Sequence, residues 1–237
     1  MNWREFEYQN LNDKRLIIIL DSCRYDIFEK IIREYNFEYN LDKRKSYGNY
    51  TRQFYDNIPN LSNKIIVTAN PYPFYKRNKF KNVVITSSIN PNDNIIEYSN
   101  VKNKYKNDEF MLHLIPPHIP WIGKEGSKLY NEFMNKLNLR DARNKLKTER
   151  HFGPMGIEGM VYRHYGKEIS IKYYKENLKV ALDAINNNSD LLPAEFIITA
   201  DHGELFGEYN LFGHTEGQVT PDVNELRIVP WCLIKNE

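Results

Sequence analysis

The sequence predicts an α/β fold in which a mostly parallel central sheet carries helices on both faces. Short apolar runs of strand length alternate along the chain with segments whose apolar residues recur at helical spacing, the order that builds parallel sheets. The run Leu16–Leu20 is continuously apolar, as expected of a strand buried on both faces. The length of 237 residues suits one domain, so we expect a single domain over residues 1–237.

The first strand, residues 15–20, leads through a loop into a helix that carries Ile27, Phe28, Ile31 and Ile32. Residues 43–60 are polar and aromatic and are predicted to form a loop that enters a short helix. Later strands are predicted within residues 64–74, 82–88, 109–121, 194–208 and 226–234, and an amphipathic helix over residues 170–188. Residues 122–165 have no strand pattern and are interpreted as a helical insertion or lid.

Composition excludes several classes of protein. A net charge of +2 gives no basic stripe of the kind that indicates a nucleic-acid surface. No apolar run approaches the length of about 20 residues that a transmembrane helix needs. Two cysteines do not make a disulfide framework, and the first residues, MNWREFEYQN, lack the apolar core of a signal peptide. We therefore expect a cytoplasmic protein; the oligomeric state is left open.

Acidic and imidazole side chains follow three of the predicted strands. Asp21 follows the first, His118 the fourth, and Asp201 with His202 the fifth. Ligands of open α/β sheets bind beyond the carboxyl ends of the strands, so these side chains are expected at one edge. Aspartate and histidine together bind divalent ions such as zinc or manganese. The sequence thus predicts a metal site there.

Three segments resemble the alkaline phosphatase superfamily, especially its sulfatase-like branch of sulfatases, phosphodiesterases and lipoteichoic acid synthases. LIIILDSCRYDIF is similar to the first strand and turn of that family, and HLIPPHIPW to its middle histidine segment. FIITADHGELFGEYNLFGH resembles its D-H-G-E signature with the histidine that follows. The order of the segments agrees over nearly the whole chain. The resemblance implies an alkaline-phosphatase-like core with a helical insertion.

The resemblance also implies the roles of the site residues. One divalent ion (Zn, Mn, Mg or Ca) would be bound by Asp21, Thr51, Asp201 and His202. Thr51, at the expected start of a helix, would be the nucleophile and would form a covalent intermediate, with Ser46 as its rival. His118 and His214 would either bind a second ion or contact the ester oxygens.

Two departures from the family pattern bear on the kind of ester and on the number of metal ions that we expect. The chain lacks the C/S-x-P-S-R motif of sulfatases, so phosphate esters are favoured over sulfate esters. Leu114 stands where two-metal members often carry an aspartate, which leaves two histidines without a carboxylate. We therefore expect one ion per chain and leave a second open. The substrate pocket would be built from residues 122–165.

The remaining candidate site residues could also have purely structural roles. Arg24 and Arg52 are expected to clamp phosphate, since a guanidinium matches its oxygens bidentately, or else to form surface salt bridges. Cys23 is expected to be a small buried residue and His113 a satisfied strand residue. His151 and His164 are expected at the surface of the insertion.

These observations predict a metal-dependent hydrolase or transferase of small-molecule, glycan or lipid phosphate esters, acting through a threonine intermediate. A transferase that modifies cytoplasmic glycan precursors is not separated from a hydrolase by the sequence. The alternative from another class is a catalytically silent binding or scaffolding relative. The intact set of aspartates and histidines argues against it.

Overall fold

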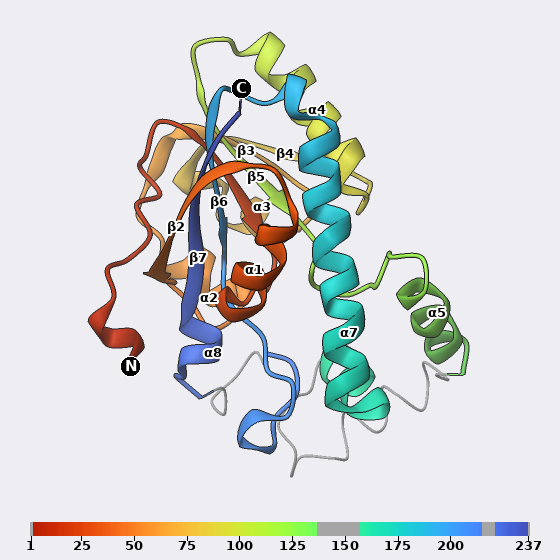
Figure 1. Ribbon diagram of the computed structural model, residues 1–237. Helices are drawn as coiled ribbons and strands as arrows, with labels where there is room; N and C mark the ends of the chain where they lie inside the picture. Colours follow the sequence, from red (N-terminus) through yellow and green to blue (C-terminus); the bar gives the residue numbers. More distant parts are fainter. Residues whose placement is uncertain (1, 137–156, 215–220, 237) are drawn as a thin grey trace.

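The computed structural model describes residues 2–136, 157–214 and 221–236, and these form a seven-stranded sheet (Figure 1). The strand order is β2-β7-β6-β1-β5-β3-β4. All neighbouring pairs are parallel except those made by β7, which runs antiparallel to β6 and β2. The strands are β1 (Leu16–Leu20), β2 (Glu38–Lys45), β3 (Leu61–Thr68), β4 (Phe80–Ile85), β5 (Glu109–Leu114), β6 (Glu195–Ala200) and β7 (Ile228–Lys235). The predicted mostly parallel α/β sheet is confirmed.

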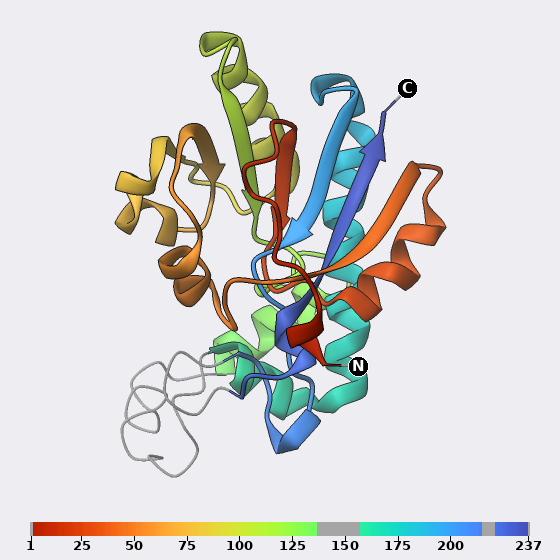
Figure 2. The same cartoon turned by 90° about the vertical axis from the view of Figure 1, so that its left-hand side faces the viewer.

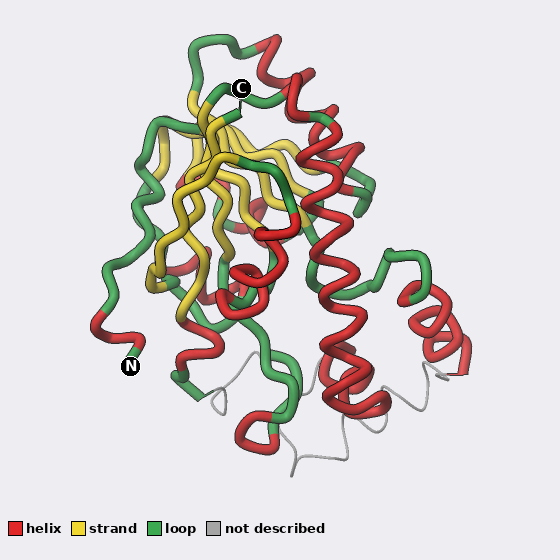
Figure 3. Tube along the Cα trace, viewed as in Figure 1, coloured by secondary structure: helices red, strands yellow, loops and turns green. Residues whose placement is uncertain are grey.

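Helices connect the strands, and the tube drawing shows them alternating with strands along most of the chain (Figure 3). The α-helices are α1 (Tyr25–Ile31), α2 (Thr51–Asn57), α3 (Tyr72–Tyr75), α4 (Pro91–Lys104), α5 (Gly126–Lys136), α7 (Ile157–Asn187) and α8 (Asn224–Arg227). Short 3-10 turns are η1 (Trp3–Glu5), η2 (Ile32–Glu34), η3 (Arg77–Lys79), η4 (Ser189–Leu191) and η5 (Glu208–Asn210). None of the described helices is both long enough and apolar enough to cross a lipid bilayer.

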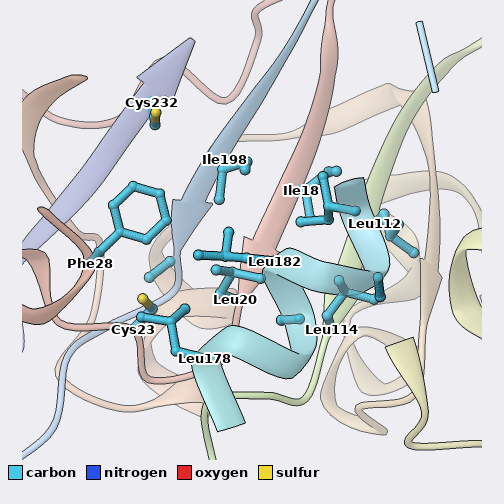
Figure 4. Packing of buried hydrophobic residues seen from close by; sticks show 14 of the residues in the cluster. Ile18, Leu20, Cys23, Phe28, Leu112, Leu114, Leu178, Leu182, Ile198 and Cys232 are labelled. Carbon is cyan, nitrogen blue, oxygen red and sulfur yellow. The ribbon is translucent and has the colours of Figure 1, made fainter. Parts of the chain in front are cut away.

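Both faces of the sheet are buried, which explains why the central strands are apolar without a break. Alternate residues of a strand point to opposite faces. On one face Ile18 and Leu20 belong to the same cluster as Leu178 and Leu182 of α7 (Figure 4). On the other face Ile17 and Ile19 cluster with the aromatic side chains of α2, among others.

The edge strand β2 was not predicted. Its sequence, EYNLDKRK, is polar and charged, and its side chains alternate between exposed and half-buried positions. Hydrophobic periodicity detects strands that bury one face. An edge strand with charged side chains lacks this periodicity and is therefore missed. The prediction of a loop at residues 43–45 was therefore wrong, whereas the short helix predicted next is α2.

The end of the predicted insertion and the helix predicted after it both lie in helix α7. Helix α7 begins at Ile157, inside the predicted insertion of residues 122–165, and continues to Asn187. Its path breaks at Gly166, whose φ of 79° and ψ of 171° are not helical. The boundary predicted at residue 165 is therefore a kink within α7. Residues 137–156 lie outside the described part of the chain, so the lid role stays a prediction.

Candidate active site

The site residues lie where the parallel strands end. Asp21 follows β1, Asn70 follows β3, His118 follows β5, and Asp201 and His202 follow β6. The two views show the loops after these strands gathered at one end of the sheet, beside α8 and the lower half of α7 (Figures 1 and 2). This is the edge at which the sequence predicted a metal site.

Asp21, Asp201 and His202 form a first ligand group, buried from solvent, whose candidate ligand atoms all lie within 4.8 Å of one another. Asp201 Oδ1 accepts hydrogen bonds of 2.9 Å from the backbone N–H groups of Ser22 and His202. Asp201 Oδ2 is buried and has no hydrogen-bond partner among the described residues. A buried carboxylate oxygen without a partner is costly, and a bound cation would satisfy it. The group therefore fits a divalent ion.

Thr51 is the first residue of α2 and lies against this group. Its Oγ1 is 3.2 Å from His202 Nε2, and its side chain is almost fully buried. His202 Nδ1 is 2.7 Å from the carbonyl oxygen of Gly203, which only accepts, so Nδ1 carries the proton. Burial lowers the pKa of His202 to about 4, so its ring is neutral near pH 7. In that state, with no ion bound, Nε2 accepts a hydrogen bond from the Thr51 hydroxyl.

The hydroxyl of Ser46, the rival nucleophile, is occupied by hydrogen bonds to the backbone. It is buried, its Oγ contacts the carbonyl oxygen of Asp201, and Gly48 both donates to and accepts from the hydroxyl at 3.0 Å. These contacts tie the loop before α2 to the end of β6. Of the two hydroxyls, that of Thr51 is the one hydrogen-bonded to a histidine of the first ligand group.

A second ligand group consists of His118, Glu204 and His214, again with ligand atoms within 4.8 Å of one another. The His214 ring lies 4.2 Å from the His202 ring and 5.1 Å from the His118 ring, centroid to centroid. His214 Nδ1 is 3.2 Å from both carboxylate oxygens of Glu204. Burial would lower the pKa of His214, but nearby carboxylates, Glu204 foremost and then Glu158 and Asp21, together raise it to about 10.

Glu204 corrects the premise of the one-ion prediction. That prediction held that two histidines lacked a carboxylate, because Leu114 occupies the usual aspartate position. Leu114 is indeed packed in the apolar core, but Glu204 supplies a carboxylate from another strand end. Glu204 is the fourth residue of the D-H-G-E segment, so the sequence itself carries the signal for this carboxylate.

Asp21 is oriented by two side chains that the sequence analysis did not assign to the site. Asn70 Nδ2 donates to Asp21 Oδ2 at 2.8 Å, and His113 Nε2 lies 3.5 Å from the same oxygen. Burial would raise the pKa of Asp21, but the imidazoles of His118, His113 and His202 hold it below its ordinary value. His113 is buried, as expected of a strand residue, with Nδ1 2.6 Å from the Tyr55 hydroxyl. It is not fully satisfied as predicted, because Nε2 has no hydrogen-bond partner among the described residues. Asn70 follows a strand end, a pattern that could have found it.

The two arginines are engaged by carboxylates of their own surroundings. Arg24 is buried and pairs with Asp26 at 2.8 Å and with Glu208 at 3.0 Å. Arg52 is exposed and lies 3.9 Å from Asp56, one turn further along α2. Arg52 thus forms the surface salt bridge that the sequence analysis gave as the alternative, whereas the ion pairs of Arg24 are made by a buried side chain. Phosphate clamping by either residue stays a prediction.

Cys23 and His164 belong to neither ligand group. Cys23 is buried in the apolar cluster, as expected. His164 is exposed and packs its ring 5.1 Å from that of Phe133. His151 lies outside the described residues.

Comparison with known proteins identifies the fold. No family model and no curated protein matches the sequence. The periplasmic domain of the phosphoethanolamine transferase EptC from Campylobacter jejuni aligns with a TM-score of 0.54 at 14% identity, over 98% of this chain and 83% of that one. The chain shares its fold with this transferase domain.

Two further structures agree with this fold. The soluble domain of lipooligosaccharide phosphoethanolamine transferase A from Neisseria meningitidis has a TM-score of 0.51 at 14% identity, over 100% of this chain and 81% of that one. A zinc complex of the periplasmic EptC domain from Escherichia coli has a TM-score of 0.50 at 11% identity, over 98% and 76%. The fold that the three sequence segments predicted is confirmed.

Proposed function

We propose that the protein is a metal-dependent enzyme that transfers or hydrolyses phosphate esters through a covalent intermediate on Thr51. The observation that carries the proposal is the position of the Thr51 hydroxyl, 3.2 Å from His202 Nε2 and beside a buried group of two aspartates and a histidine. A hydroxyl placed at such a group is the arrangement that activates a threonine as a nucleophile. The fold supports the proposal, since similar structures carry the names of phosphoethanolamine transferases.

The ligand groups assign the metal-binding residues. Asp21, Asp201, His202 and Thr51 would hold one ion, and His118, Glu204 and His214 would hold a second. A divalent ion there would neutralise phosphate oxygens and lower the pKa of a coordinated hydroxyl. The zinc complex of a structural neighbour makes zinc the first ion to test.

The chemical step follows from the position of Thr51. Its oxygen forms a bond to phosphorus while the bond from phosphorus to the leaving alcohol breaks. The Thr51 proton is released, and the departing oxygen takes up a proton, so none is consumed overall. Water, or a second alcohol, then attacks the phosphothreonine and restores the hydroxyl.

The substrate class is a glycan or lipid phosphate ester, by analogy with a neighbour named for transfer to lipooligosaccharide. Sulfate esters remain less favoured because the sulfatase motif is missing from the sequence. The cytoplasmic location stays a prediction.

Mass spectrometry tests the nucleophile. Protein loaded with zinc and quenched with bis(4-nitrophenyl) phosphate should carry a phosphate-ester adduct on the peptide that contains Thr51. Thr51→Ala should show neither adduct nor turnover, whereas Ser46→Ala, the matched hydroxyl control, should keep the adduct. An adduct on Ser46, or a Thr51→Ala protein that retains turnover, would refute the assignment.

Metal analysis separates the enzyme from a silent relative. Asp201→Asn keeps the shape of the side chain but removes the charge, so we expect it to lose most bound metal and activity while circular dichroism stays unchanged. A wild-type protein that binds no divalent ion and forms no adduct would favour the scaffolding alternative instead.

A further inference from the structure

Helix α7 turns two polar side chains, Tyr174 and Asn177, toward the site on a buried face that, apart from these and Ser170, is mostly apolar. Both are fully buried and stand three residues apart, so they lie one above the other on the helix. Their neighbours Leu178, Ala181 and Leu182 pack in the core, and Figure 4 shows Leu178 and Leu182 on α7 near the strands. A buried polar group on a packing face is costly unless its hydrogen bonds are satisfied. The partners of these two side chains therefore show what they do.

Asn177 ties together the backbone of the loop that follows β5. Its Nδ2 donates to the carbonyl oxygens of His118 at 2.9 Å and Pro120 at 3.0 Å, with Pro117 O at 3.4 Å. Its Oδ1 accepts from the N–H groups of Ile122 at 2.7 Å and Gly123 at 3.2 Å. One amide thus fixes the backbone on both sides of the His118–Ile119 segment.

This segment determines which nitrogen of His118 is open to a ligand. His118 Nδ1 lies 2.6 Å from the carbonyl oxygen of Ile119, which only accepts a hydrogen bond. Nδ1 therefore carries the proton, and Nε2 is the nitrogen left with a free lone pair. The same arrangement holds His202 through Gly203 O. A backbone carbonyl that fixes the ring of a metal-binding histidine is a recognised means of tuning a ligand.

Tyr174 makes the equivalent contact to the loop that follows β1. Its hydroxyl donates to Ser22 O at 2.6 Å and accepts from Arg24 N at 2.9 Å. Asp21 is the residue next to Ser22. One helix therefore holds the loop of the first ligand group and the loop of the second.

We propose that Asn177 is a positioning residue, which holds the 117–123 loop so that His118 presents Nε2 to Glu204 and His214. Helix α7 then holds the loops of both ligand groups: Tyr174 contacts the loop of the first group and Asn177 the loop of the second. The proposal rests on the proposed function only where it assigns His118 to an ion-binding group; the orientation of the ring is independent of it.

The test uses an isosteric substitution with a matched control. Asn177→Asp keeps the accepting oxygen but replaces the donating amide with a carboxylate, which the carbonyls of His118 and Pro120 repel. Asn94 of α4 is the control, because it is also fully buried and its amide donates to the carbonyls of Ser88 and Asn90 at 2.8 and 2.7 Å. Asn94→Asp therefore carries the same chemical change in the loop after β4.

The first measurement is made on the metal-free whole chain. Long-range 1H–15N correlation spectra should show His118 of the wild type and of Asn94→Asp as the Nδ1–H tautomer. Asn177→Asp should show a mixture of tautomers. A His118 ring that keeps the wild-type tautomer in Asn177→Asp overturns the proposal, and if that variant does not fold, Asn177→Ala is measured instead against Asn94→Ala.

The second measurement is zinc affinity by competition with a chromophoric chelator. Loss of the contact should weaken one of two zinc ions by about 10- to 100-fold, the range typical of groups that orient a ligand. The other ion, and both ions of Asn94→Asp, should keep wild-type affinity. Equal weakening in the two variants would show a merely structural role. A wild type that binds no zinc refutes the proposed function, while the tautomer spectra still decide the role of Asn177.

Discussion

His202 and His214 are neighbouring imidazoles that differ in protonation state. Burial lowers the pKa of His202 to about 4, whereas the Glu204 carboxylate raises that of His214 to about 10. Near neutral pH, in the absence of metal, His202 is therefore neutral and His214 is charged. An ion that binds His214 must displace its proton, so affinity at the second group should rise with pH up to about 10.

Glu204→Gln tests the origin of this charge. Without the Glu204 carboxylate, burial is opposed only by the weaker attraction of the Glu158 and Asp21 carboxylates, so the pKa of His214 should fall well below about 10. The measurement is an NMR pH titration of the histidine ring protons in metal-free protein. Glu208→Gln is the control, because that carboxylate pairs with Arg24. A His214 pKa that stays near 10 in Glu204→Gln would contradict the assignment.

At the scale of single residues, the sequence predicted side chains that follow strand ends or stand in the family motifs. Asp21, Asp201, His202 and Thr51 are close together in the structure as predicted, although their metal role stays a proposal. Asn177 could not be predicted, because its role comes from contacts with a loop 59 residues away in the sequence. A polar residue on an apolar helical face is expected to be buried, but the sequence does not show which groups it will contact.

Among the elements, α7 contains a residue with non-helical backbone geometry. Gly166 has φ 79° and ψ 171°, a region that residues with a side chain avoid, and no described atom lies within 4 Å of where a Cβ would be. The kink sets the direction of the first part of the helix, where Tyr162 and Tyr165 lie 6.2 and 5.9 Å from Trp121, ring centroid to ring centroid.

Gly166→Ala should therefore destabilise the protein through its backbone and not through a clash. We expect the free energy of unfolding to fall by about 1–3 kcal/mol, the cost of such a conformation. Urea denaturation measures it, with Glu168→Ala at an exposed helical position as the control, expected within about 0.5 kcal/mol of wild type. Equal stability of the two variants would show that α7 straightens without cost.

Prediction of elements succeeded where burial leaves a pattern. The central strands are buried on both faces and read as apolar runs, so they were found. Strand β2 has a solvent-facing edge and charged side chains, and its place is determined by pairing with β7, which local sequence does not encode. The boundary predicted at residue 165 lies beside Gly166, where the backbone of α7 leaves helical geometry, and the role of residues 122–165 stays a prediction.

For the molecule as a whole, strand order predicts an uneven distribution of stability. Among the described strands, β2 pairs with β7 alone, whereas β1 lies between β5 and β6 and is fully buried. Local opening should release β2 at lower free energy than β1, which should open only on global unfolding. Hydrogen exchange should therefore be faster for the paired amides of β2 than for those of β1, by about tenfold for each 1.4 kcal/mol of difference. Equal protection of β1 and β2 would contradict this reading.

The place of β7 between β2 and β6 also constrains synthesis on the ribosome. Strand β2 is translated early, but its pairing partner is translated only after β6. Until then the nascent chain exposes one edge of β6, whose sequence EFIITA is almost entirely apolar. Such an edge is a template for pairing with other chains. Translation that stalls before residue 228 should consequently yield an aggregation-prone intermediate that depends on chaperones, a liability that disappears once β7 closes the gap.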